Sequence, residues 1–76
     1  MIKVNELKGI IKARGYSQKD VANKIGIAPK TFYEKMAKGV FGSDEIELMI
    51  NFLDIENPVD IFFAPDVNYE VTKEAL

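Results

Sequence analysis

Residues 17–39 have the sequence SQKDVANKIGIAPKTFYEKMAKG, in which signals for the start and the end of two short helices follow one another. Ser17 can accept a hydrogen bond from the backbone N–H of Asp20, whose carboxylate can reach back, as in a short capping box. Gly26 suits the left-handed position at which helices end. Pro29 suits the first turn of a second helix, because its missing N–H would be unpaired there. The sequence therefore predicts two short helices joined by a turn of roughly three or four residues.

Apolar residues recur at helical spacing in both predicted helices. Val21, Ala22 and Ile25 make the buried face of the first, and Phe32 and Met36 make that of the second. Two such helices joined by a turn that contains glycine are typical of the helix-turn-helix motif. The helices of that motif cross at a steep angle, and a side chain larger than the methyl group of Ala22 at the crossing would force them apart.

A further helix is predicted upstream, over residues 4–14, with Gly15 as its stop signal. Gly9 inside it costs about 1 kcal/mol relative to alanine, which indicates either a close helix contact or a marginal helix. The apolar residues of this helix are Val4, Leu7, Ile10 and Ile11.

Two more helices are predicted downstream. Ser43 is expected to cap a fourth helix, and Asp44 and Glu45 in its first turn have the charge that a helix N-terminus favours. Asn57 and Pro58 begin a short fifth helix, which ends before residue 65. The apolar residues of these two helices are Ile46, Met49, Ile50, Leu53, Val59, Ile61 and Phe62, and we expect Phe32, Met36, Phe41 and Phe52 to lie in the core.

The chain is thus predicted to be all-α, with a five-helix domain over residues 1–65 and a tail over residues 66–76. Val67, Tyr69 and Val71 alternate with polar residues in the tail, which indicates an edge strand or an extended segment. Since a lone strand is unstable, it would need a partner, and the nearest candidate is its symmetry mate in a dimer.

Length and composition restrict the class of protein. A chain of 76 residues forms one domain with a thin core, so that dimerisation would add useful apolar contact. The sequence contains no cysteine and no histidine, which excludes disulfides and the common zinc sites. We expect no metal, no cofactor and no evident small-molecule ligand. The absence of a signal peptide and of a long apolar run favours a soluble, cytoplasmic protein without membrane contact.

The net charge of −2 conceals an uneven distribution along the chain. Residues 1–40 contain nine basic and three acidic side chains, a net charge of +6, whereas residues 41–76 contain one basic and nine acidic side chains, a net charge of −8. Such a division turns the basic half of a small domain toward a polyanion. The alternative is that the basic and the acidic residues form two ordinary solvent-exposed surfaces and have no role in binding nucleic acid.

The pattern Gln18-xxx-Ala22-xxx-Gly26-Ile27, followed by Pro29-Lys30-Thr31-Phe32-Tyr33, resembles the Cro/repressor (xenobiotic response element) family of phage and bacterial regulators. The resemblance covers roughly residues 4–63 and implies a five-helix, repressor-like DNA-binding domain. Two positions depart from the family pattern. Ala28 replaces the usual Ser, Thr or Asn cap of the recognition helix, and Lys35 stands where an apolar residue is common, with Met36 taking the buried role.

A helix from Pro29 that lies in the major groove would contact base edges through its exposed N-terminal side chains. Lys30 can donate to guanine O6 and N7, and Glu34 can accept from cytosine N4, although these two residues could instead pair with each other. The predicted base contacts are Pro29, Lys30, Tyr33 and Glu34. The predicted phosphate contacts are Gln18 and Thr31, which match family positions, and the basic residues Lys19, Lys35 and Lys38.

The resulting hypothesis is a transcriptional regulator of the phage or prophage type that binds an inverted repeat of double-stranded DNA as a homodimer, with recognition helices roughly 34 Å apart. The alternative is a protein-interaction module, such as an anti-repressor or an antitoxin, that docks a partner through Phe62, Phe63 and Tyr69. An enzyme is disfavoured, since a short chain without histidine or cysteine has little room for a catalytic pocket.

Overall fold

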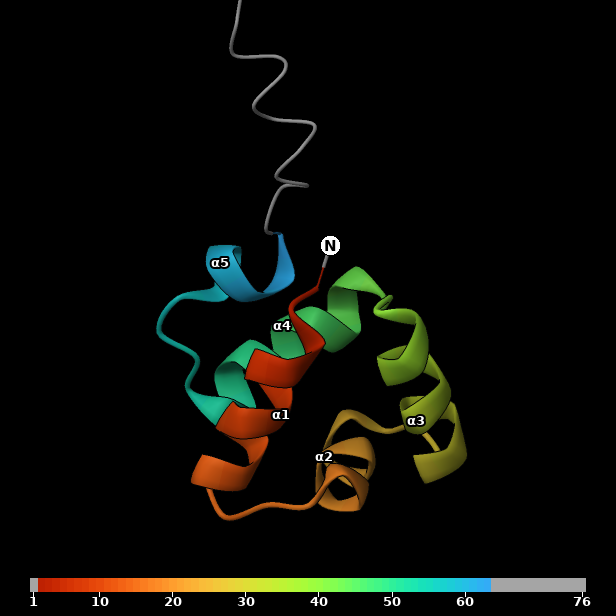
Figure 1. Cartoon of the computed structure of the whole chain (residues 1–76). Coiled ribbons are helices and arrows are strands. Elements are labelled where there is room, and N and C mark those ends of the chain that lie inside the picture. The colour runs from red at the N-terminus through yellow and green to blue at the C-terminus, as the bar shows by residue number, and fades with distance from the viewer. Residues whose placement is uncertain (1, 64–76) are drawn as a thin grey trace, which may run out of the picture.

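The computed structural model describes residues 2–63, and this part of the chain consists of helices and short connections (Figure 1). The prediction of an all-α fold with five helices is therefore confirmed for these residues. The predicted tail over residues 66–76, with its proposed strand, lies outside them. The helices are α1 (Val4–Ala13), α2 (Gln18–Ile25), α3 (Pro29–Lys38), α4 (Ser43–Leu53) and α5 (Pro58–Phe62).

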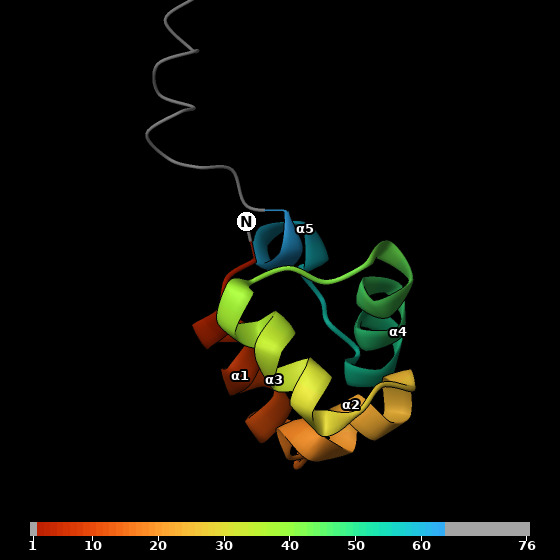
Figure 2. The same cartoon turned by 90° about the vertical axis from the view of Figure 1, so that its right-hand side faces the viewer.

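Helix α2 is the element on which the others assemble. It packs against α1, α3 and α4, and its Val21 and Ala22 side chains are fully buried. Helix α5 packs on α1, and the backbone N–H of Lys3 donates to the Ile61 carbonyl at 2.8 Å. As a result, α5 and the N-terminal segment lie at the end of the molecule opposite α2 (Figures 1 and 2).

One apolar cluster holds the helices together. Phe32 and Met36 are buried as predicted, and Phe41 is also buried and packs its ring against Phe32, with the centroids 5.4 Å apart. Phe52 packs against this cluster but is only half-buried, so the prediction that it lies in the core is met in part. The largest side chains with almost no exposed surface are Leu7, Ile11, Val21, Phe32, Met49, Leu53 and Ile61.

The capping signals predicted around α2 are confirmed. The Asp20 N–H donates to Ser17 Oγ at 3.0 Å, and the Ser17 N–H donates to Asp20 Oδ2 at 2.9 Å. Gly26 ends the helix with a φ of 82°, a conformation that favours glycine because a Cβ atom would be strained there.

The start of α4 differs from the prediction. Gly42, not Ser43, is the N-cap residue, and Ser43 is the first residue of the helix. Glycine has no side chain with which to cap, but the Glu45 carboxylate reaches back and accepts the Gly42 N–H at 2.8 Å. The residue that organises this helix start is therefore Glu45.

The other end of α4 is closed by a residue distant in sequence. Arg14 Nε donates to the Leu53 carbonyl at 2.8 Å, and Nη2 donates to the Asp54 carbonyl at 3.0 Å. A cation and its donors at a helix C-terminus satisfy carbonyls that have no partner within the helix. Arg14 directly follows α1, so these bonds join the ends of α1 and α4.

Gly9 lies on an open part of α1. A Cβ atom built at this position would meet nothing within 4 Å outside its own helix. The interpretation of Gly9 as a close helix contact is therefore wrong. None of the helices within residues 2–63 has the length and apolar character needed to cross a membrane.

Candidate nucleic-acid interface

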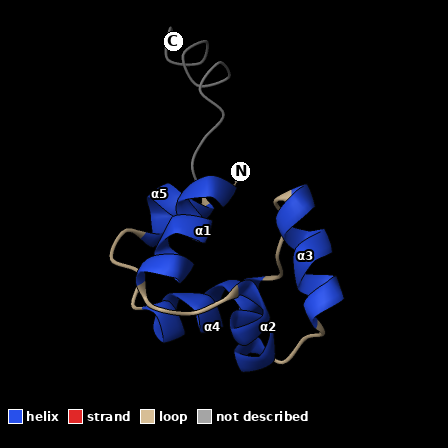
Figure 3. Ribbon diagram, turned by 60° about the horizontal axis from the view of Figure 1, so that its bottom comes forward, coloured by secondary structure: helices blue, strands red, loops and turns tan. Residues whose placement is uncertain are grey.

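Helices α2 and α3 form a packed pair joined by a short turn (Figure 3). The turn begins at Gly26, and the Ile27 N–H donates to the Ala22 carbonyl at 3.0 Å. The complete burial of Ala22 agrees with a position at which no larger side chain fits. Ala28 is the extended N-cap residue of α3, with no side-chain cap, and Pro29 follows as the first helical residue. The pair thus consists of two short, packed helices joined by a short turn, as the sequence predicts.

Helix α3 has one buried face and one face in solvent. Phe32 and Met36 point into the core. Positions 30, 33, 34, 37 and 38 are all exposed, and their spacing of three and four residues places them along one stripe of the helix. We call these five residues, Lys30, Tyr33, Glu34, Ala37 and Lys38, the α3 stripe.

The residues predicted to contact bases lie on the exposed side of α3 or at its start. Lys30 and Glu34 are exposed, Tyr33 keeps 50% of its surface in solvent, and Pro29 is half-buried at the first helical position. Within residues 2–63, ion pairs are found only at Lys3–Glu6 and Lys35–Glu45. The alternative in which Lys30 and Glu34 pair with each other is therefore absent, and both side chains are accessible.

Of the predicted phosphate contacts, Lys38 belongs to this stripe, and Gln18, Lys19 and Thr31 lie at the start of α2 and in the first turn of α3. Gln18 is half-buried at the first position of α2, and Lys19 beside it is exposed. Thr31 is half-buried in the first turn of α3, and Lys38 is exposed at its last residue. The structure thus brings polar side chains to the N-terminus of α2 and to both ends of α3.

Lys35, the fifth predicted phosphate contact, is engaged inside the molecule. Its ammonium Nζ lies 2.8 Å from Glu45 Oε1 and 2.7 Å from Oε2. Glu45 is 8% exposed and also accepts the Gly42 N–H, so this carboxylate joins α3 to the start of α4. The prediction of a free surface lysine is therefore wrong: position 35 lies beside Met36 at the edge of the core, and the partly exposed Lys35 side chain pairs with the nearly buried Glu45 carboxylate. Lys35 is therefore not part of the candidate interface.

This ion pair is not predicted from the sequence, although each residue gives a separate signal. Lys35 departs from the apolar residue common in the family pattern, and Glu45 is expected only to favour the N-terminus of its helix by charge. A lysine at an otherwise apolar position indicates a buried acid nearby, and that signal could have pointed to Glu45.

The Asp20 carboxylate, in the first turn of α2, accepts the hydrogen bond that caps this helix. The backbone N–H of Ser17, and then the Ser17 hydroxyl, lower the pKa of the Asp20 carboxyl below its ordinary value of 3.8. Asp20 therefore stays ionised while its Oδ2 atom is turned toward Ser17. Lys19 and Lys30 remain as exposed cations on either side of the turn.

Comparisons with protein families, with curated proteins and with solved structures found no match for this chain. The resemblance to the Cro/repressor family accordingly rests on the residues of the motif and contributes to a proposal only.

The residues of the alternative, protein-docking hypothesis are divided between core and surface. Phe62 is buried and belongs to the core, so its assignment to a docking surface is wrong. Phe63 is 58% exposed, and Tyr69 lies outside the described residues. Phe63 and the exposed Val40 border a shallow apolar groove of about 240 Å³, which is completed by Ile2, Gly39, Phe41, Ile46 and Phe62.

Proposed function

We propose that this protein binds double-stranded DNA in a sequence-specific manner and regulates transcription, as a repressor of the phage or prophage type. The observation that carries the proposal is the α3 stripe: a helix anchored by Phe32 and Met36 that presents Lys30, Tyr33 and Glu34 to solvent. The major groove of B-DNA is wide enough to accept one α-helix, and its base edges offer donors and acceptors to these side chains.

Each exposed group has a defined role in the proposal. Lys30 donates to the acceptors of guanine, and Glu34 accepts from the amino group of cytosine. Gln18, Lys19, Thr31 and Lys38 contact phosphates and fix the position of the domain without reading sequence. Because Lys30 and Glu34 are not paired with each other, neither must break an ion pair within residues 2–63 before it contacts DNA.

The proposal includes a homodimer on an inverted repeat. Val40 and Phe63 are exposed apolar side chains beside α5, and α5 lies opposite α2 in the molecule. A contact between copies through that end would leave the α3 stripe free on both subunits, with recognition helices roughly 34 Å apart on the duplex. A cytoplasmic location follows from a DNA target and belongs to the same proposal.

The decisive experiment is selection of bound sites from random duplex DNA by the purified full-length chain. Enrichment of inverted repeats would support the proposal. Retention of no DNA would refute it and favour the protein-interaction module, whose candidate surface contains Phe63 and Val40.

A set of lysine variants then separates base reading from phosphate contact. Lys30→Ala should lower the preference for the selected site over random DNA by about 1–3 kcal/mol. Lys19→Ala should weaken binding to all sequences alike, and the slope of log affinity against log salt concentration should become smaller by about 1. Lys8, an exposed lysine of α1, is the matched control, and Lys8→Ala should change neither the sequence preference nor the salt dependence of binding. Equal losses on selected and random DNA for both test variants would refute these roles.

A further inference from the structure

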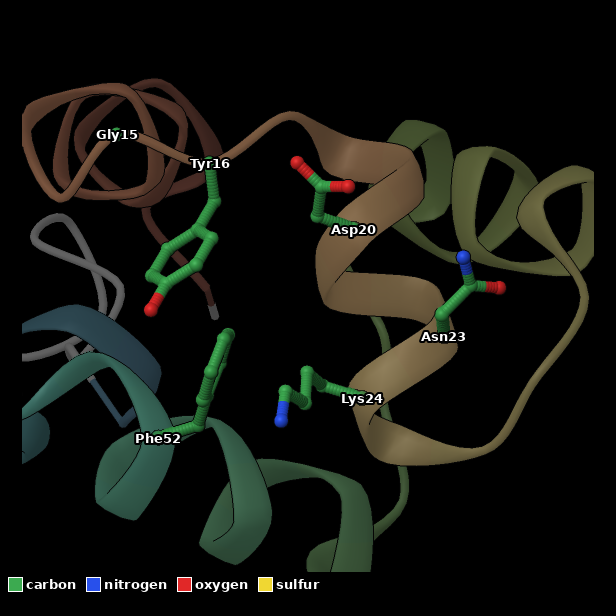
Figure 4. Close-up of a pocket in the computed structure, with 6 residues that line it drawn as sticks. All are labelled: Gly15, Tyr16, Asp20, Asn23, Lys24 and Phe52. Atoms are coloured by element: carbon green, nitrogen blue, oxygen red, sulfur yellow. The ribbon is translucent and has the colours of Figure 1, made fainter.

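A pocket of about 480 Å³ opens between the α1–α2 turn, α2 and the C-terminal half of α4 (Figure 4). Helix α2 separates it from α3, so the pocket lies apart from the α3 stripe. Its volume falls in the range of about 300–1,000 Å³ that is usual for small-molecule sites. The lining residues are Gly15, Tyr16, Asp20, Asn23, Lys24 and Phe52.

Two aromatic rings make one wall of this pocket. Tyr16 points down from the turn and Phe52 points up from α4, and their ring centroids are 4.5 Å apart at an interplanar angle of 40°. Phe52 is half-buried rather than enclosed, so part of this apolar ring surface faces the open pocket. Exposed aromatic surface beside polar groups is typical of ligand sites.

The polar wall belongs to α2 and carries two opposite charges. Asp20 and Lys24 are one helical turn apart, a spacing at which acidic and basic side chains commonly pair. Within residues 2–63 they do not pair, because Asp20 Oδ2 accepts the Ser17 N–H and Lys24 Nζ lies over the Phe52 ring, 5.4 Å from its centroid. The exposed amide of Asn23 lies on the same wall.

We propose that this pocket binds a small aromatic zwitterion, of which an aromatic α-amino acid is the simplest example. The ligand ring packs on Phe52 and Tyr16 and takes the place of the Lys24 ammonium, which moves on its flexible chain to the ligand carboxylate. The ligand ammonium is met by the Asp20 carboxylate, whose Oδ1 is not part of the cap. This site is independent of the proposed DNA binding, and its test does not use DNA.

The first test is an NMR titration of the ¹⁵N-labelled full-length chain with L-phenylalanine. We expect saturable shifts confined to the amides of the α1–α2 turn, α2 and the region of Phe52, with a dissociation constant on the order of 1 mM, as befits an open pocket and a small ligand. Phenethylamine lacks the carboxylate and 3-phenylpropionate lacks the ammonium. Each should bind about tenfold more weakly, the loss expected for one charged contact.

The second test uses variants that remove one wall at a time. Lys24→Met keeps the aliphatic chain and should weaken L-phenylalanine about tenfold without affecting phenethylamine. Phe52→Leu should weaken all three probes. Lys8→Met, a matched change on exposed α1, should change none.

Three results would overturn the proposal: no saturable shift with L-phenylalanine, equal affinity for the three probes, or shifts centred on other helices. If a variant proves unfolded by circular dichroism, the comparison of the three probes on the unaltered chain still decides, because it needs no mutation.

Discussion

Replacing Lys35 by methionine tests whether the ion pair with Glu45 stabilises the fold. Methionine keeps the length and the apolar stem of the side chain but removes the ammonium that lies 2.7 and 2.8 Å from the two carboxylate oxygens. Glu45 would keep only the hydrogen bond from the Gly42 N–H. A nearly buried carboxylate would then lack a counter-charge.

The size of the effect follows from burial. Removing one partner of a completely buried pair costs about 3–5 kcal/mol. Here the Glu45 side chain is 11% exposed and that of Lys35 is 32% exposed, so water screens part of the charge, and we expect a loss of about 1–2 kcal/mol. This is a large part of the roughly 3–5 kcal/mol that a core of this size supplies.

Urea unfolding followed by far-ultraviolet circular dichroism measures this loss. With a slope of about 1 kcal/mol per molar urea for so small a domain, the midpoint of Lys35→Met should fall by about 1–2 M. Lys38→Met, on an exposed position of the same helix, is the control and should change stability by less than about 0.5 kcal/mol.

A double-mutant cycle separates the pair from its surroundings. Glu45→Gln should cost less than Lys35→Met, because the Lys35 side chain is partly exposed and its ammonium can turn to water, whereas the nearly buried carboxylate cannot. Adding Glu45→Gln to Lys35→Met should recover about 1 kcal/mol, since a neutral amide needs no counter-charge. Strictly additive losses, or no loss in Lys35→Met, would refute the reasoning.

Three further predictions concern single helices. Gly9→Ala should raise the unfolding free energy by about 0.5–1 kcal/mol, because the added methyl meets nothing within 4 Å and alanine favours a helix; an unchanged thermal midpoint would contradict this. Ala28→Ser, which adds a hydroxyl at an N-cap that now has no side-chain bond, should stabilise α3 by about 0.5–1 kcal/mol in urea unfolding, and a loss would show that the cap geometry is unsuitable. Asp20 has a folded-state pKa lowered by hydrogen bonds from Ser17, so its contribution is present above pH 3.8 and is lost as the pH falls through the folded value; Asp20→Asn should therefore flatten the loss of stability measured below pH 4, and an unaltered pH profile would count against the cap.

Much of the fold could be predicted because its signals are local. The Ser17–Asp20 cap, the glycine stop at position 26 and the proline start at position 29 each act through atoms within a few residues, so the sequence specifies where these helices begin and end. The exposed stripe of α3 follows in the same way from the period of the helix, once Phe32 and Met36 are assigned to the core.

The predictions that failed depended on contacts that the type of a single residue does not reveal. The N-cap of α4 was misplaced by one residue, because the choice rested on the type of side chain at Ser43 and ignored the reach of Glu45 to Gly42. The protein-docking hypothesis places Phe62 on a surface and the core prediction includes Phe52, whereas the structure buries Phe62 and leaves Phe52 half-buried against the core. Hydrophobicity alone did not distinguish these two phenylalanines.

The amino-acid sequence by itself therefore determined the helices, the turn between α2 and α3, and the face of α3 that meets solvent, since helix propensity, capping and periodicity act over one or two turns of chain. Only the tertiary structure decided that Lys35 pairs with Glu45, that Arg14 closes the end of α4, and that Tyr16 and Phe52 form one wall of a pocket. Each of these contacts joins different elements, and its existence depends on how the helices pack rather than on any short stretch of residues.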